Sequence, residues 1–174
     1  LNAFAKAHPE FAVRRAYLSP RHEREQYALG LKEVRDHFPG CAVMVVDSDE
    51  VWNEEGLVEL RRAVTDNPDK LYFQAGLHDH VKSPLYRIDP QPANRPLVAL
   101  QHPNVRCAGV RFNAAARESP GAIMQGEATY CHYPYVRCDW SEITHKLMNT
   151  GSQDGPVRHN WFQEVWPNLP WGED

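Results

Sequence analysis

Three carboxylates follow an apolar stretch of the chain without a break. The stretch Cys41-Ala-Val-Met-Val-Val46 is rich in β-branched residues and leads directly into Asp47-Ser-Asp-Glu50. Ligands of open α/β sheets bind just beyond the carboxyl ends of the strands, so acids placed there face a site. Two aspartates with one residue between them can converge on one divalent cation, and hard oxygen ligands suit Mg or Mn. A strand that runs into a solvated acidic loop has the same pattern.

A second group of polar and aromatic residues lies further along the chain, in Tyr130-Cys-His-Tyr-Pro-Tyr-Val-Arg137. We expect it at the end of one strand and before a helix. His132 is a candidate metal ligand, while Arg137 and the tyrosines can contact phosphate or stack on a ring. The alternative is an edge segment whose aromatic side chains fill the core and whose arginine is solvated.

The elements that position these residues follow from the spacing of apolar side chains. Ser19-Pro20 is typical of a helix start, and Pro39-Gly40 ends that helix before the 41–46 strand. The apolar stripe of the helix consists of Tyr27, Leu31, Val34 and Phe38. Asn53 can cap a second helix that ends near Asn67 and carries Leu57, Leu60 and Val64 on one face. Helix, strand, acidic turn and helix predict a parallel α/β sheet.

The rest of the chain predicts short strands separated by prolines. The candidates are 71–75, 85–88, 97–100, 105–112 and 122–130. They indicate an antiparallel or mixed extension of the sheet. Asp139-Trp-Ser-Glu142 has the spacing of a capping box and would start a helix to Asn149. Residues 150–174 are rich in Trp and Pro, and we expect an irregular cap there.

Bulk composition narrows the class of protein. With 174 residues, 42% apolar and 24% charged, the chain suits one soluble domain over 1–174. A net charge of −4 argues against non-specific binding of nucleic acid. We recognise no secretory signal and no apolar run of membrane-spanning length. The four cysteines include no Cys-x-x-Cys pair, and Cys41 falls in an expected buried strand, so we expect reduced thiols and a cytoplasmic protein.

Three segments in order resemble nucleotide-sugar glycosyltransferases of GT-A type, most of all the family 2-like group. They are Arg24-x-x-x-Ala28, Gly40-Cys-Ala-Val-Met-Val-Val-Asp-Ser-Asp-Glu-Val-Trp52 and His132-Tyr-x-Tyr-Val-Arg137. The resemblance covers roughly residues 15–65 and 122–150. It implies a Rossmann-like mixed sheet flanked by helices. It also implies a hexosyltransferase-like enzyme that moves a sugar from a nucleoside diphosphate to a hydroxyl acceptor, with inversion.

The same resemblance implies roles for individual residues. Asp49 would bind Mn or Mg at the donor diphosphate, Asp47 would contribute to the metal site or the ribose, and His132 would complete the metal shell. The metal would neutralise charge on the leaving diphosphate. Arg137 and Lys146 can clamp the same phosphates, although surface charges near a helix start explain them equally well.

An inverting transferase also needs a base that deprotonates the acceptor hydroxyl. Glu127, on the strand before His132, is the first candidate. Asp79, in His78-Asp-His80, is the second. Each also fits an ordinary loop or surface acid.

The chain departs from the family in its N-terminal part. Only forty residues precede Cys41, and they hold one good helix and a weak strand candidate at 11–17. The first strand and nucleotide-binding loop of a GT-A domain are not recognised there. We therefore expect a partial domain with the metal-binding and acceptor half, completed by a missing N-terminal segment or a partner chain.

A phosphohydrolase of the haloacid dehalogenase type is the main alternative. Val45-Val-Asp-Ser-Asp-Glu-Val51 fits its first motif, with Asp47 as nucleophile, Asp49 as general acid and Mg as cofactor. That class also needs a second pair of acids after a later strand. Neither His78-Asp-His80 nor Gln153-Asp-Gly155 follows a convincing apolar strand with paired carboxylates.

Two further alternatives are not enzymes. A carbohydrate-binding or assembly module would use the Trp and Tyr side chains and would show no dependence on divalent metal. A zinc module would use His132 with Cys131 and Cys138, but this spacing lacks the short Cys pair of such sites.

Overall fold

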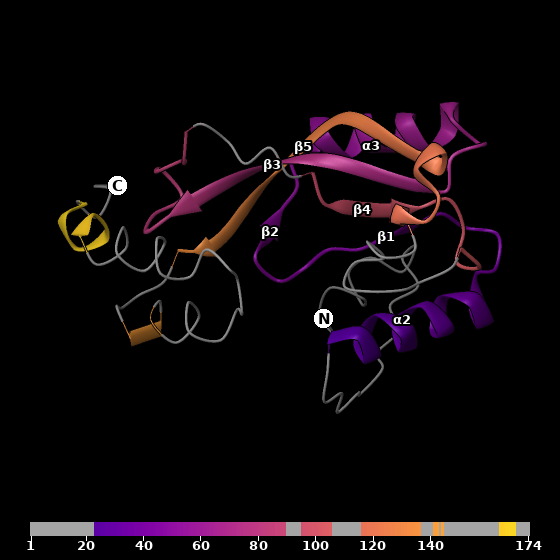
Figure 1. Cartoon of the computed structure of the whole chain (residues 1–174), viewed down its shortest axis with the longest axis horizontal. Coiled ribbons are helices and arrows are strands. Elements are labelled where there is room, and N and C mark those ends of the chain that lie inside the picture. Colours follow the sequence, from indigo (N-terminus) through magenta and orange to yellow (C-terminus); the bar gives the residue numbers. More distant parts are fainter. Residues whose placement is uncertain are drawn as a thin grey trace, which may run out of the picture.

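The computed structural model describes residues 23–89, 95–105, 116–136, 141, 142, 144 and 164–169. Within them the chain forms two α-helices and a five-stranded mixed open sheet. Helices α2 (Glu23–His37) and α3 (Glu54–Asp66) lie on opposite faces of the sheet (Figure 1). The strands are β1 (Val43–Met44), β2 (Glu50–Val51), β3 (Tyr72–Val81), β4 (Leu97–Leu100) and β5 (Ile123–Tyr135). Two short 3₁₀ helices, η2 (Pro120–Ala122) and η3 (Trp166–Asn168), complete the described elements.

The strand order places the acidic turn in an unusual position. The order is β1-β4-β3-β5-β2, in which β3 and β5 pair in parallel and every other pair is antiparallel. Strands β1 and β2, on either side of the turn, are therefore the two opposite edges of the sheet (Figure 1). The chain crosses from one edge to the other between residues 44 and 50. This crossing brings the acids to β5.

Two expectations about this region are wrong. The strand expected over 41–46 is reduced to β1, and it pairs antiparallel with β4 rather than inside a parallel sheet. Cys41 precedes the strand and is half-buried, and its thiol donates to the Phe38 carbonyl at 3.1 Å. The physical reason is that β1 has one neighbour only, and the chain leaves it to make the crossing.

Some of the other predicted elements occur in the structure, and others differ from it or fall outside the described residues. Strand β4 matches the prediction, and β3 and β5 contain the predicted 71–75 and 122–130 segments but run further. The 85–88 segment follows Pro84 as a turn, with a single bridge from Arg87 to His80. Val105 lies in a bend, and 106–112 fall outside the described residues. The helix start at Ser19, most of the 139–149 helix and most of the 150–174 tail also fall outside them.

Apolar side chains form one cluster on each face of the sheet. Neighbouring strand residues point to opposite faces, so Tyr72 packs on the α2 side and Phe73 on the α3 side. Leu31 anchors α2 to its cluster, and Leu60 anchors α3. Neither of these helices is long and apolar enough to cross a membrane, in the part of the chain that the structure describes.

Helix α3 begins as the sequence predicts and lies very close to β5. The Asn53 side chain accepts a hydrogen bond from Gly56 N at 2.8 Å. A Cβ atom on Gly56 would lie 2.3 Å from the Thr129 carbonyl oxygen, so only glycine fits there. Leu60 is buried, whereas Leu57 is 43% exposed, so the apolar face is narrower than predicted.

Candidate active site

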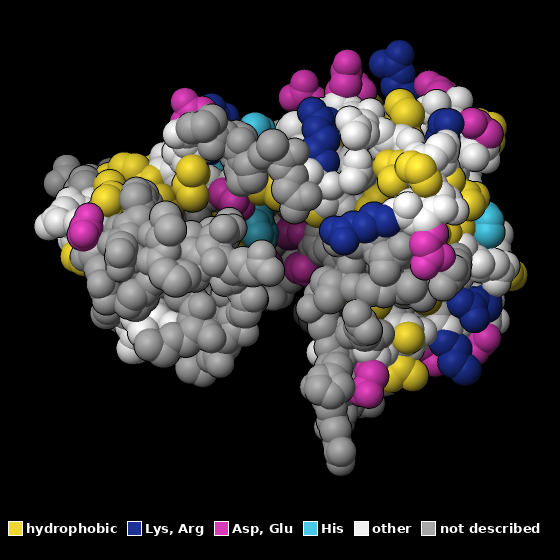
Figure 2. All heavy atoms as spheres, in the orientation of Figure 1, with side chains coloured by type: hydrophobic (Ala, Val, Ile, Leu, Met, Phe, Trp, Pro, Cys, Tyr) yellow, Lys and Arg dark blue, Asp and Glu magenta, His cyan; other side chains and the backbone are white. Residues whose placement is uncertain are grey.

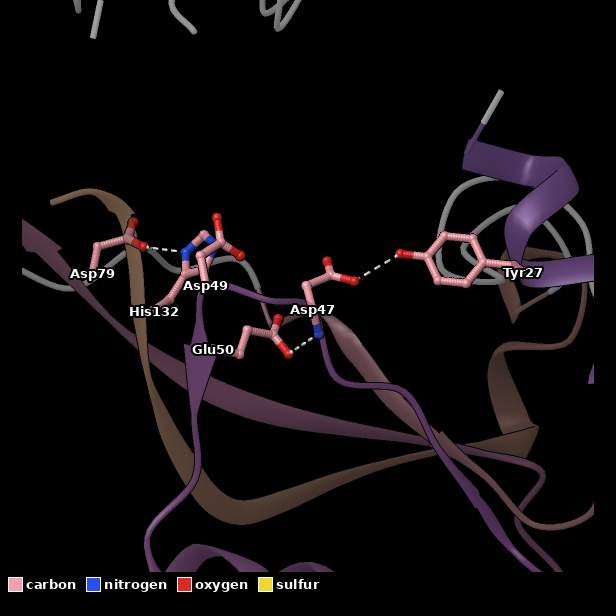
Figure 3. A network of polar contacts seen from close by, with 6 residues as sticks. All are labelled: Tyr27, Asp47, Asp49, Glu50, Asp79 and His132. Carbon is pink, nitrogen blue, oxygen red and sulfur yellow. Dashed lines mark hydrogen bonds and ion pairs between the residues drawn. The ribbon is translucent and has the colours of Figure 1, made fainter. Parts of the chain in front are cut away.

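His132 lies on β5 between side chains from two other parts of the sheet. The β3–β5 register places Asp79 opposite His132, and the β2–β5 register places Glu50 opposite it from the other side. His132 Nδ1 is 2.6 Å from Asp79 Oδ1, and Nε2 is 3.8 Å from Asp49 Oδ1 (Figure 3). The three side chains are 15–26% exposed. They form a partly sheltered row rather than a solvated surface.

The two contacts of the imidazole differ in kind. A carboxylate only accepts hydrogen bonds, so in the short contact to Asp79 the ring Nδ1 is the donor and carries a hydrogen. The other ring nitrogen, Nε2, faces Asp49. A distance of 3.8 Å is too long for a hydrogen bond. Nε2 and the Asp49 carboxylate therefore face each other without a direct hydrogen bond.

Hydrogen bonds hold the acidic turn at both ends. Glu50 N donates to the Asp47 carbonyl at 3.1 Å, and Asp47 N donates to Glu50 Oε2 at 3.1 Å. Tyr133 N donates to the Asp49 carbonyl at 2.8 Å, which joins the turn to β5. The Tyr27 hydroxyl donates to Asp47 Oδ1 at 3.3 Å (Figure 3). Asp47 is thus held toward α2, and Asp49 toward His132.

Aromatic stacking fixes the short strand β2. The Trp52 ring stacks on Tyr130 with 4.7 Å between centroids and 15° between planes. Tyr130 is buried on the α3 side of the sheet. A strand of two residues has few hydrogen bonds of its own, so this stack contributes much of what keeps the turn beside β5.

A pocket of about 470 Å³ lies on the other side of the acidic turn. Its lining residues are Gln26, Tyr27, Val46, Asp47, Ser48 and Asp49. The volume falls in the range of about 300–1,000 Å³ of small-molecule sites. Figure 2 shows acidic and histidine side chains near one another around the middle of the face that it presents. The turn therefore has a pocket on one side and His132 on the other.

The structure brings only some of the predicted site residues together. Asp49, His132 and Asp79 are in one row, and Asp47 is on the same turn but bonded to Tyr27. Glu127 is exposed and lies five residues before His132, roughly 16 Å away along an extended strand. Arg137 and Lys146 lie outside the described residues.

The donor set suits a divalent ion only in part. Asp49 supplies a carboxylate oxygen, which suits Mn or Mg, whereas the imidazole nitrogen of His132 is a ligand more typical of Zn, Cu, Fe or Ni. Among the described residues, no group of three or more His, Cys, Asp or Glu side chains is placed to hold a metal ion. A cation at this position would take its remaining ligands from outside these described side chains, for example from water or a bound phosphate.

A comparison with protein-family models, with curated proteins and with solved structures found no match to this chain. The interpretation of the site depends on its motifs and its geometry.

The opposite face of the same strands carries a different set of side chains. His80 is buried, and its ring lies 4.8 Å from that of Tyr133. Burial lowers the pKa of His80, so its imidazole is held neutral. Burial also raises the pKa of Tyr133, helped by a hydrogen bond with Cys131. His80 is therefore neutral and Tyr133 keeps its phenolic proton, so both groups are uncharged and act as packing.

Two residues of the site were not recognised from the sequence. The sequence places Tyr27 only in the apolar stripe of α2, and that stripe gives no sign that the Tyr27 hydroxyl reaches Asp47. Glu50 was recognised only as part of the acidic run, although it is buried and accepts from Asp47 N. A buried carboxylate beside a strand start is a signal that only the structure supplies.

Proposed function

We propose that this chain is the metal-binding and acceptor half of a GT-A-type, nucleotide-sugar glycosyltransferase. Its reaction transfers a sugar from a nucleoside diphosphate to a hydroxyl acceptor. The observation that carries the proposal is the meeting of Asp49, from the acidic turn, with His132, from β5. The two motifs of the sequence resemblance are far apart in the chain and adjacent in space.

The residues divide the work of donor binding. Asp49 and His132 would hold Mn or Mg, which supplies neutralisation of the charge on the leaving diphosphate. Asp47 borders the 470 Å³ pocket and can accept a hydrogen bond from a ribose hydroxyl. Tyr27 keeps the Asp47 carboxylate in one direction. Arg137 and Lys146 are proposed clamps on the diphosphate, and a partner chain or further segment would complete the donor pocket.

The base for the acceptor hydroxyl has two candidates with different surroundings. Glu127 is exposed, so its carboxylate is accessible to an acceptor. Asp79 is 2.6 Å from the His132 ring and only 15% exposed. Neither candidate is preferred by the geometry: Glu127 is distant from His132 along β5, and one Asp79 oxygen already accepts from the imidazole N–H.

Isothermal calorimetry tests the proposal through Asp49. The wild-type chain is titrated with Mn alone and with nucleoside diphosphates, with and without chelator. We expect diphosphate binding that requires Mn and disappears in Asp49→Asn, because the amide has no charge to hold the cation. The matched control is Asp69→Asn, whose side chain is 72% exposed beside Lys70 and far from the turn in sequence. It should bind as the wild type does.

Other outcomes would support the alternatives. Binding of a diphosphate that is independent of Mn, or that survives in Asp49→Asn, would contradict the transferase proposal. Hydrolysis of a phosphomonoester with Mg, abolished in Asp47→Asn, would favour the phosphohydrolase. Binding of glycans that is unchanged in the Asp47→Asn, Asp49→Asn double variant would favour a non-catalytic module.

A further inference from the structure

We propose that Asp79 is a positioning residue: it holds the Nδ1 hydrogen of His132 and thereby directs Nε2 at Asp49. This role differs from that of a catalytic base, because Asp79 acts through the imidazole and not on a substrate. The proposal depends on the proposed function only for the identity of the group that Nε2 meets. The orientation of the ring is a property of the chain by itself.

The first support is the length of the contact. At 2.6 Å, the Nδ1–Oδ1 distance is at the short end for hydrogen bonds, as expected for bonds between a ring N–H and a carboxylate. In this geometry the neutral ring has its hydrogen on Nδ1 and its lone pair on Nε2. The hydrogen bond of one ring nitrogen sets which nitrogen is free to bind a ligand. Asp79 therefore decides that Nε2 is the ligating atom.

The second support is the way the backbone places Asp79. Residues Tyr72 to Gln74 face Ile123 to Gln125 in simple succession, but Gly76 faces Thr129. Without this shift Asp79 would lie opposite Tyr130, and the carboxylate would miss the imidazole by two residues. Irregularities of this kind re-aim side chains and are frequent beside active sites.

A side-chain hydrogen bond supports the shifted segment. The extra residues of β5 lie between Gln125 and Thr129, and Arg95 Nη1 donates to the Gly126 carbonyl there at 2.6 Å. The carbonyl of a bulged residue has no ladder partner, so an arginine donor satisfies it. The displacement that brings Asp79 to His132 is thus held in place from outside the ladder.

The third support is the effect that a carboxylate partner of this kind has on metal affinity in known metal sites. Histidines that bind metals almost always donate their other N–H to a carboxylate, a carbonyl or water. Loss of that outer partner typically weakens metal binding about 10- to 100-fold. If Nε2 meets a cation, removal of the Asp79 carboxylate should weaken it by this factor while both proposed ligands remain.

The test begins with the metal-free chain. Long-range ¹H–¹⁵N NMR at pH 8.5 reports which ring nitrogen carries the hydrogen, and the His132 signals are assigned by their loss in His132→Gln. We expect the Nδ1–H form in the wild type and in Asp79→Asn, since the amide oxygen still accepts. Asp79→Leu has a similar shape without an acceptor and should give the Nε2–H form or a mixture. The control Asp69→Asn should change nothing.

Two results would overturn the positioning role. One is an Nε2–H ring in the wild type, which needs no variant and so does not depend on the folding of Asp79→Leu. The other is an unchanged ring in a folded Asp79→Leu chain, with folding checked by circular dichroism.

Calorimetry with Mn alone then separates this proposal from the proposed function. We expect binding about 10- to 100-fold weaker in Asp79→Leu, with partial rescue in Asp79→Asn. If the NMR result holds but the wild type binds no Mn, the transferase proposal fails and the positioning role of Asp79 stands. Equal Mn affinity in the wild type and in folded Asp79→Leu would overturn the effect on the cation.

Discussion

Two glycine-to-alanine substitutions in the helices should have opposite effects on stability. Gly56 in α3 touches β5, and a Cβ atom there would lie 2.3 Å from the Thr129 carbonyl oxygen and 2.9 Å from Asn53 Oδ1. Gly30 in α2 has open space, with nothing within 4 Å of the same added atom. Alanine is better than glycine in a helix by about 1 kcal/mol. Gly30→Ala should therefore stabilise the chain by up to about 1 kcal/mol.

At position 56 the clash outweighs that gain. The contact of 2.3 Å must lengthen by 1.1 Å to reach ordinary van der Waals contact at 3.4 Å, and the atom it meets is backbone, so the helix or β5 has to move. Overpacking of this kind costs about 1–3 kcal/mol, and a backbone clash belongs at the upper end. After the helix gain is subtracted, we expect a loss of about 2 kcal/mol. For a chain of this size the melting temperature should then fall by roughly 4–8 °C.

Thermal unfolding of the two variants, followed by circular dichroism, measures the difference directly. Because Thr129 precedes His132 by three residues on β5, Gly56→Ala should also weaken Mn binding, whereas Gly30→Ala should not. A Gly56→Ala chain as stable as Gly30→Ala would show that α3 does not lie against β5 at Thr129. The contact between α3 and β5, which helps to position His132, would then not exist as described.

Two further substitutions probe the surroundings of the site. Tyr27→Phe removes the 3.3 Å hydrogen bond to Asp47, worth about 1 kcal/mol, so calorimetry should show diphosphate affinity several-fold lower with Mn affinity unchanged. Equal diphosphate affinity would mean that Tyr27 does not orient Asp47. Burial lowers the pKa of His80 in the folded chain. As pH falls below about 6.5, the imidazole therefore binds a proton more readily in the unfolded chain, and the folded state loses stability. His80→Phe should therefore reduce the loss of stability between pH 8 and pH 5.5 in urea unfolding, and an unreduced loss would contradict the buried neutral ring.

The sequence predicted the elements that carry strong local signals. The Asn53 cap, the α3 helix and the β4 strand occur where their residues indicate them, because caps and short apolar runs act through neighbours in the chain. The 41–46 segment shows the limit of this reasoning. Its apolar residues fit a buried parallel strand equally well, and only the pairing with β4 makes it a short antiparallel edge.

The candidate site depends on pairings that leave no local trace. Strand β2 has two residues, and nothing in Glu50 and Val51 indicates that they pair with His132 and Cys131 at the far edge of the sheet. The crossing of the acidic turn from one edge to the other follows from that pairing. The sequence therefore indicates Asp49 and His132 as candidates but does not predict that the two side chains lie close together.

The role of Asp79 was beyond the sequence for a related reason. In His78-Asp-His80 the sequence suggests Asp79 as a base, yet alternation along β3 turns His80 to the face of Tyr133 and leaves Asp79 on the face of His132. A shift of the β3–β5 register by one residue would exchange these faces. The observed shift between Gln74 and Gly76 is two residues, so the faces are kept and only the position along β5 changes. The contact with His132 therefore needs both the alternation and the irregularity, and a sequence pattern encodes only the first.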